Sequence, residues 1–197
     1  MRMLPNMTVI VPGDAEEARK AVIAAAKMNG SVYIRFGRAA TPIFTTSETP
    51  FQVGKSLTLW DPSFAQGSGA AKPQVAILST GSLSYTALAA AKALSEGGIE
   101  STVIHFPTIK PLDEEAVLNA AIRAGRVVTV EEHQVAGGFG SAVAEFLAEH
   151  HPVPMKRIGV QDQFGQSGSP DELLSYYGLD ALSIEEAVRA LLSSHSY

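Results

Sequence analysis

The stretch of sequence that decides the fold is Arg126-Val-Val-Thr-Val-Glu-Glu-His-Gln-Val-Ala-Gly-Gly-Phe-Gly-Ser-Ala-Val-Ala-Glu-Phe-Leu147. Its valines form a β-branched run typical of a buried parallel strand, and three polar residues follow where that strand is expected to end: Glu131, Glu132 and His133. A tight turn is permitted by three glycines, Gly137, Gly138 and Gly140. Apolar residues then recur at helical spacing. The stretch predicts a strand, a polar tip, a glycine turn and a helix, with the tip at the sheet edge where ligands collect.

Composition narrows the class of protein. The chain has 197 residues, 46% of them hydrophobic, which is enough for one sizeable core. A formal net charge of -5 without a basic run argues against nucleic acid or a membrane surface as partner. The sequence has no Cys, which excludes disulfides and thiol chemistry and suits the cytoplasm. We therefore expect a soluble cytoplasmic protein with a small-molecule or protein partner and no membrane span.

The first 40 residues form a unit of their own. Residues 7–11 predict a strand, Asp14-Ala-Glu-Glu17 predicts a capped helix start, and residues 31–38 predict a second strand. Two strands and a helix cannot bury a core alone. This βαβ unit either packs on the rest of the chain or ends a domain whose body lies elsewhere.

A regular alternation of strands and helices follows a connector at residues 41–72, which holds one strand near Lys55–Trp60. Strands are predicted at residues 74–80, 100–105, 126–130 and 153–160. Of the helices between them, one ends at Gly97, and another begins at Asp113-Glu-Glu and ends at Gly125. Two capping boxes, at Ser169 and at Ser183, predict the closing helices. This order predicts an α/β domain over residues 73–197 with a mostly parallel sheet.

The glycine turn partly matches the dinucleotide-binding fingerprint, and Asp162 follows the next strand, where a ribose-binding acid belongs. Val143 stands where the fingerprint needs a third small residue, and the turn comes late in the series. A purely structural turn is the alternative and the better supported one.

Two groups of side chains remain as candidates for chemistry. His133 beside Glu131 and Glu132 could transfer a proton, but no nucleophile motif accompanies it, and a loop or interface role is the alternative. Arg35 and Arg38 end a strand, where a guanidinium fork could bind phosphate or carboxylate, or could simply be solvated. The five histidines show no metal-ligand spacing.

Several motifs together resemble the C-terminal part of transketolase. They are Thr108-Ile-Lys-Pro-Leu-Asp113, Val130-Glu-Glu-His133 with Gly137-Gly-Phe-Gly140, Ser167-Gly-Ser-Pro-Asp-Glu-Leu-Leu174, Phe51-Gln-Val-Gly54 and Tyr33-Ile-Arg-Phe-Gly-Arg38. The resemblance spans the whole chain in the right order. It implies a three-layer α/β/α C-terminal domain with a sheet of about five strands, preceded at residues 1–40 by the last βαβ unit of the pyrimidine domain of a thiamine-diphosphate enzyme.

The resemblance also implies a function. It implies ketol transfer between sugar phosphates with thiamine diphosphate and Mg, as in the pentose phosphate pathway. Arg38 is the first candidate for the substrate-phosphate ligand and Arg35 the second, because the local alignment can shift between them. His133 and the glycine turn would shape the domain surface and dimer contacts.

The cofactor motif of the family, Gly-Asp-Gly followed by Asn, is absent, since Ala15 follows Gly13-Asp14. We therefore expect that this chain alone binds no cofactor and is inactive, and that it needs an N-terminal transketolase portion or subunit as partner. We also expect a homodimer or a higher assembly. The alternative is a non-catalytic interaction or regulatory module derived from the same domain.

Overall fold

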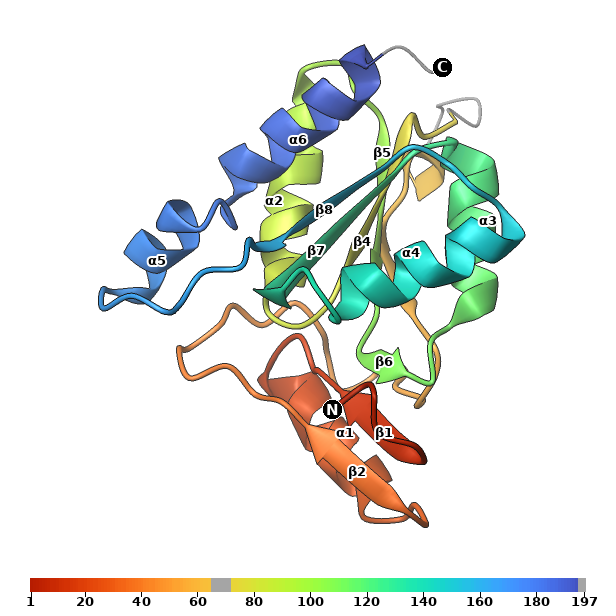
Figure 1. Ribbon diagram of the computed structural model, residues 1–197, viewed down its shortest axis with the longest axis vertical. Coiled ribbons are helices and arrows are strands. Elements are labelled where there is room, and N and C mark those ends of the chain that lie inside the picture. The colour runs from red at the N-terminus through yellow and green to blue at the C-terminus, as the bar shows by residue number, and fades with distance from the viewer. Residues whose placement is uncertain (65–71, 195–197) are drawn as a thin grey trace.

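The computed structural model describes residues 1–64 and 72–194. The chain builds two β-sheets, a three-stranded one near the N-terminus and a five-stranded one that fills the larger part of the molecule (Figure 1). Residues 65–71 of the predicted connector lie outside the described residues. The predicted domain boundaries at residues 40 and 72 stay predictions.

The five-stranded sheet has the order β3-β5-β4-β7-β8. Its strands are β3 (Leu57–Trp60), β4 (Val75–Ser79), β5 (Ser101–His105), β7 (Val127–Gln134) and β8 (Met155–Val160). β4, β5, β7 and β8 run parallel, and β3 pairs antiparallel with β5 at one edge. The mostly parallel five-stranded sheet is confirmed, and the strand of the connector is its edge strand.

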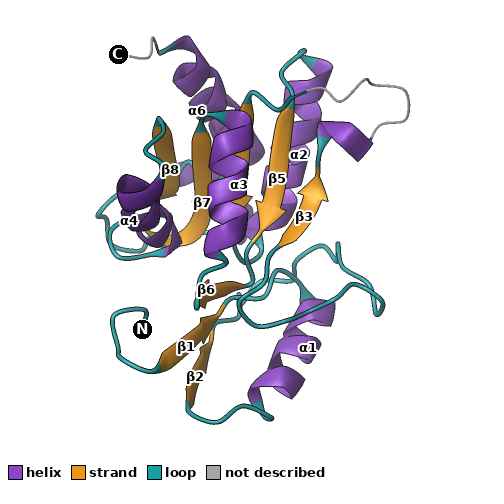
Figure 2. Cartoon of the chain, turned by 90° about the vertical axis from the view of Figure 1, so that its right-hand side faces the viewer, coloured by secondary structure: helices purple, strands orange, loops and turns teal. Residues whose placement is uncertain are grey.

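Helices cover both faces of this sheet, so the three-layer architecture is confirmed (Figure 2). One face carries α3 (Glu114–Ala124) and α4 (Phe139–His150), and the other carries α2 (Leu83–Glu96) and α6 (Ala181–Ser193). A parallel sheet needs this double cover because its strands are apolar on both faces. The other described helices are α1 (Ala15–Ala25), the short α5 (Pro170–Tyr176) and the 3-10 turn Pro62–Phe64.

The N-terminal sheet has the order β2-β1-β6, formed by β1 (Met7–Ile10), β2 (Ser31–Ile34) and β6 (Thr108–Lys110). The pattern did not predict β6, because three residues before a proline are too few to show an alternation. β6 pairs antiparallel with β1 and so joins the first unit to the rest of the chain. Arg2 adds a bidentate pair with Glu145 of α4, at 2.7 and 2.8 Å. The first unit therefore packs on the α/β domain.

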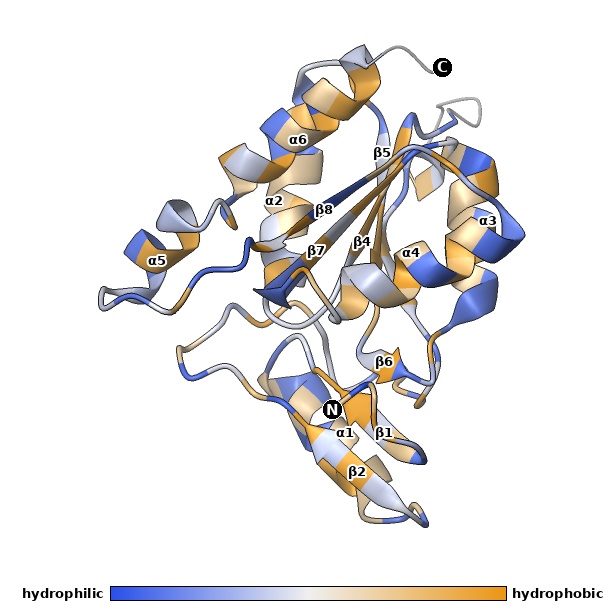
Figure 3. Ribbon diagram, in the orientation of Figure 1, coloured by the Kyte–Doolittle hydropathy of each residue, from blue (hydrophilic) through white to orange (hydrophobic). Residues whose placement is uncertain are grey.

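β7 is longer than its valine run predicts. The strand continues through the three polar residues to Gln134, which pairs with Val160 of β8 after a register shift. Figure 3 shows this end of β7 as a hydrophilic tip on an otherwise apolar strand. The prediction that the strand ends before Glu131 is therefore wrong, because pairing with β8 extends it past the apolar run.

The helix starts follow local hydrogen bonds. Three helices start as predicted: α1 at Asp14, α3 at Asp113 and α5 at the capping box of Ser169. The predicted start at Ser183 is wrong, because the side chain of Asp180 accepts the N–H of Ser183 at 2.9 Å and caps α6 three residues earlier. Aspartate competes well for this position because its carboxylate accepts a helix N–H.

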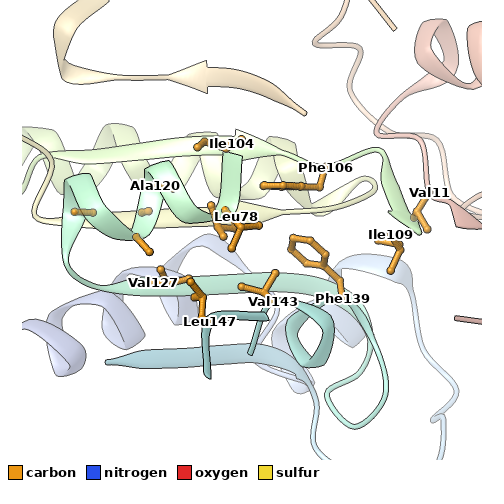
Figure 4. Packing of buried hydrophobic residues seen from close by; sticks show 14 of the residues in the cluster. Val11, Leu78, Ile104, Phe106, Ile109, Ala120, Val127, Phe139, Val143 and Leu147 are labelled. Atoms are coloured by element: carbon orange, nitrogen blue, oxygen red, sulfur yellow. The ribbon is translucent and has the colours of Figure 1, made fainter. Parts of the chain in front are cut away.

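The core lies on both sides of the central sheet. Figure 4 shows Leu78, Phe106, Phe139 and Val143 packed together on the side of α3 and α4. The rings of Phe106 and Phe139 lie 5.2 Å apart, centre to centre. In the described residues, no helix is long and apolar enough to cross a membrane.

The layer of α2 and α6 gives a test of packing. Leu94 of α2 is fully buried in the cluster that includes Ile184 of α6. Leu94→Ala should lower the free energy of unfolding by about 2–5 kcal/mol, measured by urea denaturation, because a cavity remains. Leu182→Ala, at a position that is 63% exposed on α6, is the matched control, and it should change that free energy by less than about 0.5 kcal/mol. Equal effects of the two substitutions would contradict the packing described here.

Candidate functional site

A cavity of about 740 Å³ lies where the loop after β2 faces the start of α2, the tip of β7 and the segment around α5. Figure 1 shows these segments below and beside the carboxyl end of the parallel strands. Both predicted arginines line it, together with polar and apolar side chains from the other walls: Arg35, Arg38, Tyr85, Glu132, Leu173 and Tyr177. The structure thus brings the arginines and the strand tip, which are nearly 100 residues apart, to one cavity.

Arg35 is engaged within the chain. Its guanidinium lies 3.2 Å from a carboxylate oxygen of Glu132, and its backbone N–H donates to the carbonyl of Ile10 at 2.9 Å. The other carboxylate oxygen of Glu132 lies 3.4 Å from the hydroxyl of Ser82 at the start of α2. Arg35 therefore bridges the first unit and the α/β domain, which leaves it less available for a ligand.

Arg38 is exposed on the wall of the same cavity. Within residues 1–64 and 72–194, no carboxylate pairs with it. Gly37 beside it has open space where a side chain would be. A free guanidinium next to an open backbone is suited to bind an anion. Of the two arginines, the geometry favours Arg38.

Glu131 is buried and serves the fold. Its two carboxylate oxygens accept the backbone N–H groups of Phe139 and Gly140 at 2.6 and 2.8 Å, at the N-terminus of α4. Burial raises the pKa of this carboxyl, although the two N–H groups act in the opposite direction. A carboxylate at a helix N-terminus also meets the positive end of the helix dipole.

This contact explains the glycine turn. The N–H groups that would hold a phosphate in a dinucleotide site are already bound to Glu131. A side chain at Gly138 would collide with the Glu131 carboxylate, and one at Gly140 would collide with Thr129. Asp162 donates its N–H to Gln134, and Val143 is fully buried. These contacts agree with a structural turn and give no support to nucleotide binding.

The rest of the β7 tip divides between surface and interior. His133 and Gly137 are exposed, whereas Gly138 and Gly140 are buried under the turn. The His133 ring nitrogen Nδ1 lies 2.8 Å from the carbonyl of Gln134 and 4.0 Å from Glu131. His133 is not among the residues that line the cavity of Arg38. Its role at an interface stays a prediction.

His105 is fully buried in a chain of polar contacts that sequence reasoning missed. Its Nε2 lies 2.7 Å from a carboxylate oxygen of Glu17 on α1, and its Nδ1 lies 2.6 Å from the hydroxyl of Ser84 on α2. The hydroxyl of Ser84 also accepts a hydrogen bond from the hydroxyl of Ser79, at 2.9 Å. Both ring nitrogens of His105 therefore have a hydrogen-bond partner. The capping pattern pointed to Glu17, but no local signal pairs it with a residue 88 positions away.

The Gly13-Asp14 turn offers no ligands for a metal-bound diphosphate. Both carboxylate oxygens of Asp14 accept hydrogen bonds from this chain, from Glu17, Phe44 and Thr45. Across the described part of the chain, no three His, Asp or Glu side chains gather as a metal site would need. Asp14 is therefore not available as a ligand for Mg or for a diphosphate that Mg holds.

The crowding around Gly140 gives a prediction. Gly140→Ala should lower the free energy of unfolding by about 1–3 kcal/mol, because the added methyl meets the Thr129 hydroxyl and Arg157. Gly165→Ala, where a side chain meets nothing within 4 Å, is the control. The comparison uses urea denaturation of both variants. A tolerated Gly140→Ala would show that the turn is less closely packed than described.

The buried carboxyl of Glu131 gives a second prediction. Because its pKa is raised above the ordinary 4.5, the unfolded chain releases this proton at a lower pH than the folded chain does. As the pH rises above about 4.5, the free energy of unfolding of the parent protein should therefore fall relative to that of Glu131→Gln. Urea unfolding of both proteins from pH 4 to about 8 measures this difference. A difference that stays constant or grows in favour of the parent protein would contradict it.

Three comparisons with known proteins bear on this site. The family "Transketolase, C-terminal domain" matches residues 69–184. The 6-deoxy-6-sulfo-D-fructose transketolase subunit of Clostridium sp. strain MSTE9 is 39% identical over 197 residues, 100% of this chain and 58% of that protein. An apulose-4-phosphate transketolase subunit of Phocaeicola vulgatus is 37% identical over 91% of this chain and 54% of its own length. The 1-deoxy-D-xylulose-5-phosphate synthase 1 of Geobacter sulfurreducens is 37% identical over 98% of this chain and 30% of its own length.

A solved structure agrees with these matches. The structure named "Split gene transketolase, inactive beta4 tetramer" superposes with a TM-score of 0.89 at 41% identity, covering 98% of this chain and 60% of that one. The chain thus spans a little over half of the length of each of these subunit relatives. The family match covers more than half of the chain and includes β4, β5, β7 and β8 of the five-stranded sheet with the helices between them, while β3 lies before it. With its fold and its motifs in agreement, this chain belongs to the transketolase C-terminal domain family.

Proposed function

We propose that this chain supports transfer of a two-carbon ketol group between sugar phosphates, as the C-terminal part of a thiamine-diphosphate enzyme. The observation that carries the proposal is Arg38, an exposed guanidinium without a carboxylate partner among the described residues, on the wall of the large cavity. The names of three relatives each contain a sugar with a phosphate or a sulfo group. Arg38 suits such a tetrahedral anion because its planar donors pair with two oxygens at once.

The chain needs a partner for this chemistry. Asp14 and Glu131 use both of their carboxylate oxygens within the fold, so they are not free to bind a metal. We propose that thiamine diphosphate and Mg are held by an N-terminal transketolase portion or subunit, and that this chain is inactive alone. Relatives named as transketolase subunits support such a division. The assembly would be a homodimer or larger.

The chain's own part would be to bind and orient substrate. Arg38 would hold the anionic end, while Arg35 stays paired with Glu132 and supports the wall of the cavity. Holding the far end of a substrate keeps its reacting end in place, which lowers the entropy lost in the transition state. The test pair of substrates is xylulose 5-phosphate as donor and ribose 5-phosphate as acceptor.

The first experiment measures ketol transfer with thiamine diphosphate and Mg, by this chain alone and by this chain mixed with the N-terminal portion. Activity is expected only in the mixture. Activity of the isolated chain would contradict the division of labour proposed here. A mixture that stays silent, with both polypeptides shown to be folded, would contradict the catalytic proposal itself.

Arg38 gives a sharper prediction within the active mixture. Arg38→Ala should raise KM for ribose 5-phosphate by about 10- to 100-fold, because a charge-assisted hydrogen bond is lost. The KM for ribose, which lacks the phosphate, should barely change. Arg19→Ala removes an exposed cation of α1 and is the matched control. Equal effects on both acceptors would show that Arg38 does not bind the phosphate.

The second candidate function is a non-catalytic interaction or regulatory module. Phe164 is 95% exposed, and none of the residues of α5 is buried. Such an exposed aromatic residue on a projecting segment is typical of a protein contact. This alternative gains weight if no N-terminal portion restores activity.

A further inference from the structure

The loop that carries Arg38 is held at one end by the last residue of β1 and at the other by Asp14, the residue that caps α1. At its start, the N–H of Arg35 donates to the carbonyl of Ile10 at the end of β1, at 2.9 Å. At its end, the N–H groups of Phe44 and Thr45 donate to one carboxylate oxygen of Asp14, at 2.8 and 2.7 Å. Residues 36–43 therefore form a closed loop over the turn between β1 and α1.

Asp14 is the centre of this arrangement. Its other carboxylate oxygen accepts the N–H of Glu17, at 2.9 Å, and the hydroxyl of Thr45, at 2.8 Å. The side chain is buried, yet its pKa is lowered, because these donors outweigh the effect of burial, which alone would raise it. Four donors thus converge on one ionised group, which caps α1 and closes the loop at once.

The turn is itself fixed to the opposite wall of the cavity. One carboxylate oxygen of Glu17 accepts the N–H of Gly13 and also contacts His105, both at 2.7 Å. The edge of Phe44 rests on the His105 ring, centres 5.7 Å apart, and leaves no room for a side chain at Gly13. His105 contacts Ser84 of α2, and neighbouring residues of α2 line the cavity. One continuous set of contacts therefore places the loop relative to the rest of the site.

We propose that Asp14 is a positioning residue that holds the 36–43 loop, so that the Arg38 guanidinium meets the anionic end of the substrate. This inference rests on the proposed function, because it assigns Asp14 a role in the phosphate binding assigned to Arg38. A loop fastened at both ends loses little conformational entropy when a ligand binds. Loosening one end makes the ligand itself order the loop, which weakens binding without changing the chemical step.

Asp14→Asn tests the proposal in the complete enzyme, assembled from the full subunit and its cofactor-binding partner. An amide has one acceptor oxygen, so one pair of donors must face its NH2 group. That pair is either the two N–H groups of Phe44 and Thr45, or the N–H of Glu17 with the hydroxyl of Thr45. We expect KM for ribose 5-phosphate to rise about 10-fold, with kcat and the KM for ribose each changing by less than about 3-fold. Amide hydrogen exchange at Phe44 and Thr45 should also become faster.

Asp113→Asn is the matched control. Asp113 also caps a helix and holds a connecting segment, through the N–H of Ala116 and the N–H and hydroxyl of Ser56. It is buried to a similar degree, at 8% exposed against 4% for Asp14. Its hydrogen bonds and its ion pair join it to Ser56, Ala116 and Lys55 rather than to the 36–43 loop. The variant should therefore leave the discrimination between ribose 5-phosphate and ribose unchanged.

The outcomes distinguish a failure of the positioning role of Asp14 from a failure of the proposed function. Unchanged discrimination in Asp14→Asn, together with lost discrimination in Arg38→Ala, would overturn the positioning role and leave the proposed function standing. Unchanged discrimination in both would overturn the proposed function. Equal losses for both acceptors in Asp14→Asn would assign it a purely structural role. If Asp14→Asn does not fold, Thr45→Val removes one donor alone and should shift KM for ribose 5-phosphate in the same direction by a smaller factor.

Discussion

The contact between Glu17 and His105 is the interaction on which the arrangement of the two units depends. Both side chains are buried, and Nε2 of His105 would lose its partner if the units separated or shifted. An unpaired buried polar group is costly, so the pair specifies one relative placement of the units. It brings the end of β1 to the start of α2, and the cavity of about 740 Å³ lies beside this junction.

Glu131 shows how one buried carboxylate can decide what a motif does. The strand, glycine turn and helix resemble a phosphate-binding arrangement, and the helix N-terminus would be able to hold an anion. The chain supplies that anion itself, and Gly138 and Gly140 are needed because Glu131 and Thr129 fill the space beside them. In this chain the helix N-terminus is occupied by Glu131, and the anion binding that we propose belongs to Arg38 on another loop.

Much of the fold was predictable, because each long element carries its own periodic pattern. The valine run of β7 and the aspartate caps at positions 14 and 113 were enough to place a parallel strand and two helix starts. The prediction failed where the cause was not local. β6 exists only because β1 lies beside it, and β7 runs on to Gln134 only because β8 continues to pair with it. The arginines were predictable as candidates, but the Asp14 contacts to Phe44 and Thr45 were not.

By itself, the sequence determined the α/β class and the order of the long elements. These properties depend on spacing along the chain, and spacing is what periodicity and capping report. The tertiary structure alone decided which of the polar side chains would meet. It paired Glu17 with His105, bound Arg35 to Glu132 and left Arg38 exposed at the cavity. Such pairs join residues 88 and 97 positions apart, and a contact at that distance depends on how whole layers pack rather than on any local pattern.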